Sequence, residues 1–142
     1  MNKNGPIVVI EDDLDDQHIL YEIFKNLDFQ NPVIYFSEGE EALSFLVATD
    51  IKPFLILCDI NMPKLNGFEL REKIYTNQNL NLKCIPYLFF TTTSNQKSVV
   101  DAYSQSVQGF FIKPASAEKL ERIIKLIVEY WQECEAPKFI PA

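Results

Sequence analysis

Short apolar runs alternate along this chain with stretches in which apolar residues recur every three or four positions. Runs of four to six mostly apolar residues, bounded by turn-forming residues, are typical of strands that are buried on both faces. Five runs predict strands at residues 7–10, 33–36, 54–59, 85–90 and 109–112. An amphipathic stretch follows each run, and this repeated β-α pattern favours a parallel sheet with helices on both faces. The predicted fold class is therefore α/β with a doubly wound sheet.

The amphipathic stretches carry recognisable signals at their ends. The spacing of Ser37-Glu-Gly-Glu40 predicts a capping box before the second helix. The helix after Gly67 is expected to end in the polar segment 76–81, which lacks apolar periodicity. The helix at 95–105 has a thin apolar face, and Ser116 is expected to cap the last helix.

The alternation leaves no internal linker, so we expect one domain over residues 1–142. Its core would span about residues 6–135, with a short tail at 136–142. No apolar run approaches the roughly 18 residues that a membrane-spanning helix needs. The chain has 3 cysteines, no C-x-x-C spacing and no visible signal peptide, which favours reduced thiols and a cytoplasmic location.

The charge balance narrows the class of partner. The net charge is −7, with 20 acidic and 13 basic residues. Because nucleic-acid binding needs a basic face, a direct nucleic-acid partner is not expected. The acids are also unevenly placed, since five of them fall between Glu11 and Asp16, after the first predicted strand.

Charged and hydroxyl residues stand at the carboxyl ends of four predicted strands. The carboxyl ends of parallel strands meet at one edge of the sheet, where open α/β sheets bind ligands. The residues brought there are Glu11, Asp12, Asp59, Thr91 and Lys113. Taken singly, each acid or hydroxyl is equally well explained as a helix cap, and the lysine as a surface charge.

Taken together, these residues point to a specific chemistry. Clustered carboxylates repel one another unless a cation lies among them, and carboxylates with room for water suit Mg²⁺. Lys113 would supply a positive charge for an anion beside the metal. A metal, a nucleophilic carboxylate such as Asp59, a lysine and a hydroxyl are the groups needed for phosphoryl transfer to an aspartate.

Four segments, in this order and spacing, also match a known family. They are Val9-Ile-Glu-Asp-Asp13, Asp59-Ile-Asn-Met-Pro63 followed by Gly67, Thr91-Thr92, and Gly109-Phe-Phe-Ile-Lys-Pro114. Over almost its whole length the chain resembles the receiver domain of two-component response regulators. The resemblance implies a flavodoxin-like topology, with a five-stranded parallel sheet of order 2-1-3-4-5 and five helices.

The resemblance implies a role for each acid at the strand ends. Asp59 would be the phosphoacceptor. Asp12, Asp59 and the backbone carbonyl of Asn61 would bind Mg²⁺ directly, and Glu11 would act through water. Glu11 stands where this family more often has Asp, so its longer side chain is expected to shift the water-mediated contact. Asn61 and Thr93 would flank the route of the attacking water and tune dephosphorylation.

The resemblance also assigns the phosphoryl-binding and switch residues. Lys113 would pair with Asp59 before phosphorylation and with a phosphoryl oxygen afterwards. Thr91 and Thr92 would contact the phosphoryl group. Thr91 and Phe110 would form the switch, with Phe110 keeping the ring of the commoner Tyr but lacking its hydroxyl.

The resemblance implies a signalling protein whose phosphoryl donor is a sensor histidine kinase or a phosphotransfer protein. A downstream protein target would bind the face formed by the fourth helix, the fifth strand and the last helix. Because the chain ends soon after the last predicted helix, we expect a stand-alone receiver, as a monomer or weak dimer. Its chemistry would be limited to self-phosphorylation and self-dephosphorylation, without enzymatic turnover or membrane association.

Three alternatives remain at this stage. One is a receiver-like scaffold that acts without phosphorylation. Another is an aspartate-nucleophile phosphatase of the haloacid dehalogenase type, disfavoured because Asn61 stands where that chemistry needs a second aspartate. The third is a flavin- or nucleotide-binding fold, disfavoured because acids fill the loop that would have to hold phosphate. His18 as a relay histidine is far less favoured than a surface residue.

Overall fold

The computed structural model describes residues 1–92 and 95–137. Within these residues, five strands form one parallel sheet of order β2-β1-β3-β4-β5. The strands are β1 (Ile7–Ile10), β2 (Val33–Phe36), β3 (Leu55–Cys58), β4 (Tyr87–Thr91) and β5 (Gly109–Ile112). The helices are α1 (Leu14–Leu27), α2 (Gly39–Ala48), α3 (Gly67–Thr76), α4 (Gln78–Leu82), α5 (Gln96–Ser104) and α6 (Ala117–Glu133). The doubly wound parallel sheet of order 2-1-3-4-5 is thus confirmed.

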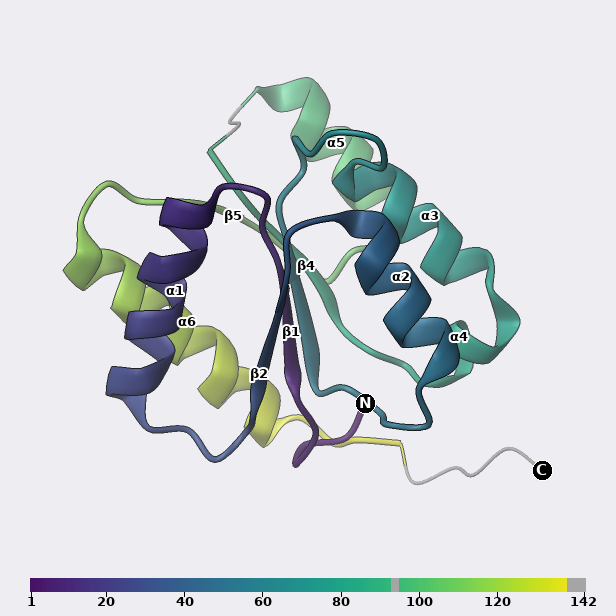
Figure 1. Cartoon of the computed structure of the whole chain (residues 1–142), viewed down its shortest axis with the longest axis horizontal. Coiled ribbons are helices and arrows are strands. Elements are labelled where there is room, and N and C mark those ends of the chain that lie inside the picture. Colours follow the sequence, from purple (N-terminus) through teal and green to yellow (C-terminus); the bar gives the residue numbers. More distant parts are fainter. Residues whose placement is uncertain (93–94, 138–142) are drawn as a thin grey trace.

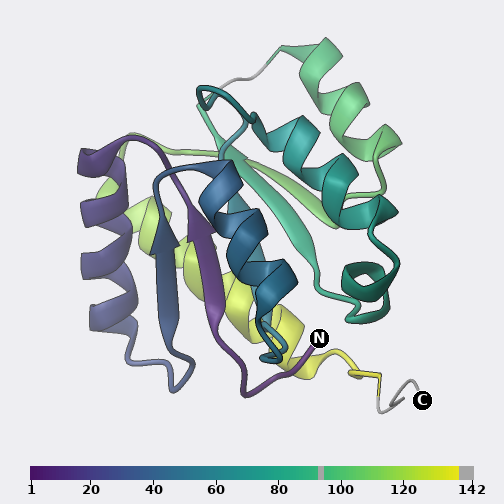
Figure 2. The ribbon, with the colours of Figure 1, turned by 45° about the vertical axis from the view of Figure 1, so that its right-hand side comes forward.

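The helices form two layers on either side of the sheet. Figure 1 shows α1 and α6 on one side and α2, α3 and α5 on the other, and the turned view of Figure 2 keeps this division. Successive strand residues point to opposite faces of a sheet. Accordingly, Ile7 and Val9 of β1 belong to the core under α1 and α6, whereas Val8 and Ile10 belong to the core under α2, α3 and α5.

The middle strands are the most deeply buried. Every residue of β1 and β3 is buried, because both strands have neighbours on each side and helices on each face. The edge strand β2 is half-buried throughout. The continuous apolar run before Asp59 therefore places this acid at the end of a central strand, where the surrounding backbone is firmly held.

Six helices, rather than the expected five, lie in the described part of the chain. The additional helix is α4, in the polar segment where the preceding helix was expected simply to end. Asn77 closes α3 and caps α4, because its side chain accepts a hydrogen bond from the Leu80 backbone N–H. Leu80 is buried, so one apolar residue and one cap are enough to hold this short helix against the core.

The predicted capping box at Ser37–Glu40 is wrong. Helix α2 begins after Glu38, and no side chain caps it. A capping box occurs instead at the start of α3, where the Asn66 side chain accepts from the Glu69 N–H and the Glu69 side chain accepts from the Asn66 N–H. The expected cap of the last helix is confirmed, since the Ser116 hydroxyl accepts from the Lys119 N–H.

No helix in residues 1–92 and 95–137 is both long and apolar enough to cross a membrane. Residues 138–142, which make up most of the predicted tail, lie outside the described residues.

Candidate functional site

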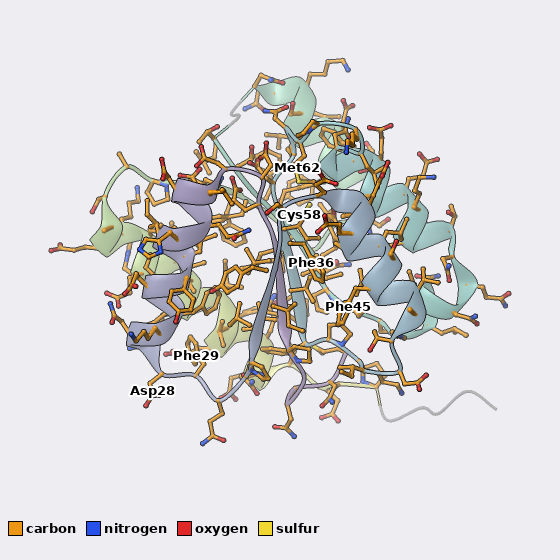
Figure 3. The ribbon with its side chains drawn as sticks, in the orientation of Figure 1. Asp28, Phe29, Phe36, Phe45, Cys58 and Met62 are labelled. Carbon is orange, nitrogen blue, oxygen red and sulfur yellow. The ribbon has the colours of Figure 1, made fainter. Side chains whose placement is uncertain are left out.

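Residues from four strand ends meet at the carboxyl edge of the sheet. They are Glu11 after β1, Asp59 after β3, Thr91 at the end of β4 and Lys113 after β5. Figure 3 labels Cys58, the last residue of β3, near this end of the sheet, and Met62 in the loop beyond it. The convergence expected from the sequence is therefore present.

Three carboxylates at this edge are close enough to share one cation. One carboxylate oxygen from each of Glu11, Asp12 and Asp59 lies within 4.8 Å of the other two. Glu11 is 2% exposed and Asp59 is 9% exposed, and Asp12 is the most exposed of the three. Oxygen ligands of this kind fit a hard divalent cation that keeps several water ligands, such as Mg²⁺.

The Lys113 ammonium lies among three carboxylates. Its Nζ atom is 2.7 Å from Oε2 of Glu11, 3.1 Å from Oδ2 of Asp16 and 3.4 Å from Oδ2 of Asp59. The expected contact with Asp59 is present, but the lysine lies closer to the other two acids. The Lys113 side chain is only 10% exposed, so these charges interact with little screening by water.

The pKa values of Glu11 and Lys113 are both raised, for different reasons. Burial raises the pKa of Glu11 to about 8, against the hydrogen bond from Lys113, which favours the ionised form. Burial alone would lower the pKa of Lys113, but the hydrogen bond and charge of Glu11 and the charge of Asp59 raise it above its usual value. Lys113 is therefore a permanent cation at neutral pH.

Backbone contacts fix the position of Asp59. Its N–H donates to the Ile10 carbonyl at 3.0 Å, and its Oδ1 accepts from the Ile60 N–H at 2.7 Å. The loop then folds back, with the Gly67 N–H donating to the Ile60 carbonyl at 2.9 Å. A Cβ atom on Gly67 would lie 2.3 Å from the Asp59 carbonyl oxygen, so only glycine fits at this position.

The start of α1 places the remaining acids. Asp13 caps this helix, because its side chain accepts from the backbone N–H groups of Asp15 and Asp16. The Asp13 N–H in turn donates to Oε1 of Glu11 at 3.3 Å. The contact between Asp16 and Lys113 is not evident from the sequence, because the helix dipole already favours acids in a first helical turn without a tertiary partner.

The other predicted site residues lie around this cluster. Thr91 is fully buried and Thr92 is exposed. The Lys113 N–H donates to the Thr91 carbonyl at 2.8 Å, which keeps β4 and β5 in register up to the site. Asn61 is exposed in the loop that follows Asp59. Thr93, expected to tune dephosphorylation, lies outside the described residues.

Phe110 connects β5 with the core beneath the site. It is half-buried, and its ring centroid is 6.2 Å from that of Phe89. The Phe89 ring also contacts Phe68 of α3 at 5.1 Å and Tyr87 of β4 at 5.3 Å. Phe110 therefore lies between the exposed side of β5 and an aromatic cluster that reaches α3.

Comparisons with known proteins bear on this geometry. The family model described as the response regulator receiver domain matches residues 7–125. Response regulator Rcp1 of Synechocystis sp. is 30% identical over 132 residues, covering 89% of this chain and 88% of that protein.

Solved structures agree with this relationship. The phosphorylated cyanobacterial phytochrome response regulator RcpA superposes with a TM-score of 0.84 and 28% identity, covering 95% of this chain and 99% of that chain. The Mn²⁺-bound form of response regulator Rcp1 superposes with a TM-score of 0.81 and 28% identity, covering 94% of this chain and 99% of that chain. With four strand ends that bring acids, a threonine and a lysine together, and a family match over most of its length, this chain belongs to the response regulator receiver domain family.

Proposed function

We propose that this receiver domain accepts a phosphoryl group on Asp59 from a histidine kinase or a histidine phosphotransfer protein. The observation that carries the proposal is the buried Lys113 ammonium, 3.4 Å from Asp59 at the edge where three carboxylates can share a cation. A buried carboxylate beside a fixed cation is suited to attack an electrophilic phosphorus atom. The relationship to RcpA, whose structure is of a phosphorylated form, supports the same reading.

In the proposed transfer, a carboxylate oxygen of Asp59 bonds to the phosphorus atom of a phosphohistidine. The phosphorus–nitrogen bond breaks, and its electron pair returns to the imidazole of the partner protein. Lys113 neutralises charge on the transferring phosphoryl oxygens, and Thr91 and Thr92 donate hydrogen bonds to them. The product is an acyl phosphate on Asp59.

Mg²⁺ is the proposed cofactor. Asp12, Asp59 and the Asn61 backbone carbonyl would hold it, with Glu11 acting through water. When bound, the cation supplies positive charge opposite the transferring phosphoryl group. The clustering of the three acids and the existence of a Mn²⁺-bound Rcp1 structure support a divalent cation at this site.

The proposed output is a change in protein contacts on the face formed by α5, β5 and α6, made by a monomer or weak dimer. Helix α5 has only one buried residue, Ala102, whereas Val100 and Tyr103 are 61% and 55% exposed. A phosphoryl group adds about −1.5 to −2 charges, and couplings of this kind are typically about 1–3 kcal/mol. Such a coupling is enough to shift a weakly held helix and to move Phe110 inward beside Thr91.

The test is direct phosphorylation of the full chain. The protein is incubated with Mg²⁺ and acetyl phosphate, and its intact mass is measured for the wild type, Asp59→Asn and Asp50→Asn. We expect one phosphoryl group on the wild type and on Asp50→Asn, which removes an exposed acid outside the site, and none on Asp59→Asn. Omitting Mg²⁺ should abolish labelling.

The other outcomes discriminate between functions. Labelling that survives in Asp59→Asn refutes the assignment of the phosphoacceptor. A wild type that never labels supports a scaffold that acts without phosphorylation. Continuous release of phosphate from simple phosphate esters supports a phosphatase, whereas we propose no turnover beyond the phosphorylation and dephosphorylation of Asp59 itself.

A further inference from the structure

The contact between Asp16 of α1 and Lys113 has no part in the function proposed above. Oδ2 of Asp16 lies 3.1 Å from Nζ of Lys113, closer than Oδ2 of Asp59 at 3.4 Å. We propose that Asp16 is a positioning residue that holds Lys113 in the unphosphorylated protein and is displaced when Asp59 carries a phosphoryl group. The inference rests on the proposed phosphorylation of Asp59.

The limited number of donors on the lysine makes its partners compete. An ammonium group has three N–H donors and no acceptor. The carboxylates of Glu11, Asp16 and Asp59 all lie within hydrogen-bonding distance of Lys113. One donor for each carboxylate occupies all three, so the several anionic oxygens of a phosphoryl group on Asp59 compete with the remaining carboxylates for Lys113.

The surroundings of the three acids indicate which of them leaves. Glu11 makes the shortest contact, 2.7 Å, and its side chain is 3% exposed, so releasing it would leave a buried carboxylate without its cation. Asp59 is the residue that carries the phosphoryl group. Asp16 is 35% exposed and does not belong to the group of acids that can share a metal ion. Water can solvate the released Asp16 carboxylate, which makes its displacement the least costly of the three.

The structure also provides space for the movement. A cavity of about 170 Å³ lies between α1 and the start of α6, on the side of Lys113 that faces α1. Asp16 and Lys113 line it together with Leu20 and Leu120. The Asp16 side chain therefore has free space beside it. Asp16 then acts as a competitor of the phosphoryl group for the same cation.

The test compares Asp16→Asn with Asp15→Asn. Both substitutions remove one negative charge from the first turn of α1, but only Asp16 contacts Lys113. The probe is beryllium fluoride, a phosphoryl mimic, titrated into the full chain with saturating Mg²⁺ and followed by ¹⁹F NMR. Because a half-exposed competing ion pair is lost, we expect Asp16→Asn to bind the probe about threefold to tenfold more tightly. Asp15→Asn should change the affinity by less than about twofold, and Asp16→Glu should restore wild-type affinity.

A double-mutant cycle tests whether Asp16 acts through the lysine. In a Lys113→Gln background, Asp16→Asn should change the affinity for the probe by less than about twofold. Urea unfolding of the same four proteins without metal gives an independent measurement. There, the effect of Asp16→Asn on the unfolding equilibrium constant should differ at least about threefold between the two backgrounds.

The outcomes separate this inference from the function on which it rests. If the wild type labels on Asp59 and binds beryllium fluoride, but Asp16→Asn behaves like Asp15→Asn, the role of Asp16 is wrong and the proposed function stands. If Asp16→Asn changes the affinity for beryllium fluoride equally with and without Lys113, the role of Asp16 is also refuted. If the wild type neither accepts a phosphoryl group from acetyl phosphate nor binds beryllium fluoride, both proposals fail.

Discussion

Replacing Gly67 by alanine tests how closely the backbone around the candidate phosphoacceptor is packed. The added Cβ would lie 2.3 Å from the Asp59 carbonyl oxygen, 2.8 Å from Cε1 of Phe89 and 3.0 Å from Cα of Ile60. Two of these three atoms belong to the backbone, which cannot rotate away as a side chain does. All three distances are well inside ordinary van der Waals contact. Either α3 must move away from β3, or Asp59 must shift.

The size of the effect follows from these contacts. Overpacking of this kind costs about 1–3 kcal/mol, and a clash with backbone belongs at the upper end. The better helix propensity of alanine offsets up to about 1 kcal/mol of this, and less at the first residue of a helix. We therefore expect Gly67→Ala to lower the free energy of unfolding by about 2 kcal/mol. Because Mg²⁺ requires oxygen ligands at about 2.0–2.1 Å, a displaced Asp59 should also weaken its binding at least about tenfold.

Gly109→Ala is the matched control. Its Cβ would lie 2.9 Å from Cδ2 of Leu88 and 2.9 Å from a ring carbon of Phe111, both of which are side-chain atoms that can shift. Neither glycine has a positive φ, so backbone strain does not distinguish the two substitutions. Urea unfolding measures the stability of each variant, and calorimetric titration measures its affinity for Mg²⁺. Equal, small losses of stability with unchanged metal affinity would refute the argument that Gly67 holds Asp59 in place.

Three further predictions concern the core, the pH dependence and the helix caps. Arg71 is buried and donates to two backbone carbonyls at the C-terminal end of α5. Arg71→Leu should therefore lower the free energy of unfolding in urea by about 2–4 kcal/mol. The same substitution at the exposed Arg122 should cost less than about 0.5 kcal/mol. Because the pKa of Glu11 is raised to about 8, metal binding below that pH must release the proton of Glu11. The affinity for Mg²⁺ should therefore be about fivefold weaker at pH 7 than at pH 8, and Glu11→Gln should remove this dependence. The same raised pKa means that the metal-free fold binds more protons than the unfolded chain, so its stability should fall between about pH 4.5 and pH 8, and less so in Glu11→Gln. Asn66→Ala should cost about 1 kcal/mol and Ser37→Ala less than about 0.5 kcal/mol, because only the first residue caps a helix.

The fold was predictable because burial imposes a simple pattern on the strands. A central parallel strand has no polar face, so β1 and β3 appear in the sequence as unbroken apolar runs. The short helix α4 escaped prediction because its sequence, Gln78 to Leu82, has no apolar period, and its stability depends on the burial of Leu80. The capping box was misplaced for a related reason. The spacing at Ser37–Glu40 permits a capping box, but the helix must also begin directly after the capping residue. Helix α2 begins only after Glu38, whereas α3 begins directly after Asn66.

Only the site residues that lie at strand ends could be predicted from the sequence. Parallel strand ends share one edge, so Asp59 and Lys113 had to lie at the same edge of the sheet wherever the helices lay. Asp16 is different, because it reaches Lys113 from the first turn of α1 and not from a strand end. That contact depends on how far α1 rotates about its axis and how closely it packs against α6. Both are set by side-chain packing between elements distant in the sequence, and no local pattern encodes them.

The charges at this edge link the cation to the phosphoryl group. Glu11, Asp16 and Asp59 surround one ammonium, and Asp12 lies close to Glu11 and Asp59. The site is therefore strongly negative whenever these acids are ionised. Burial reduces this negative charge, because it raises the pKa of Glu11 and lets that acid hold a proton in the metal-free protein. A phosphoryl group on Asp59 adds further negative charge, which the single ammonium cannot balance. The proposed cation and phosphoryl group must therefore strengthen each other's binding reciprocally. Release of Asp16 from Lys113 completes this balance, because it frees one N–H donor and moves one carboxylate toward water as the phosphoryl charge arrives.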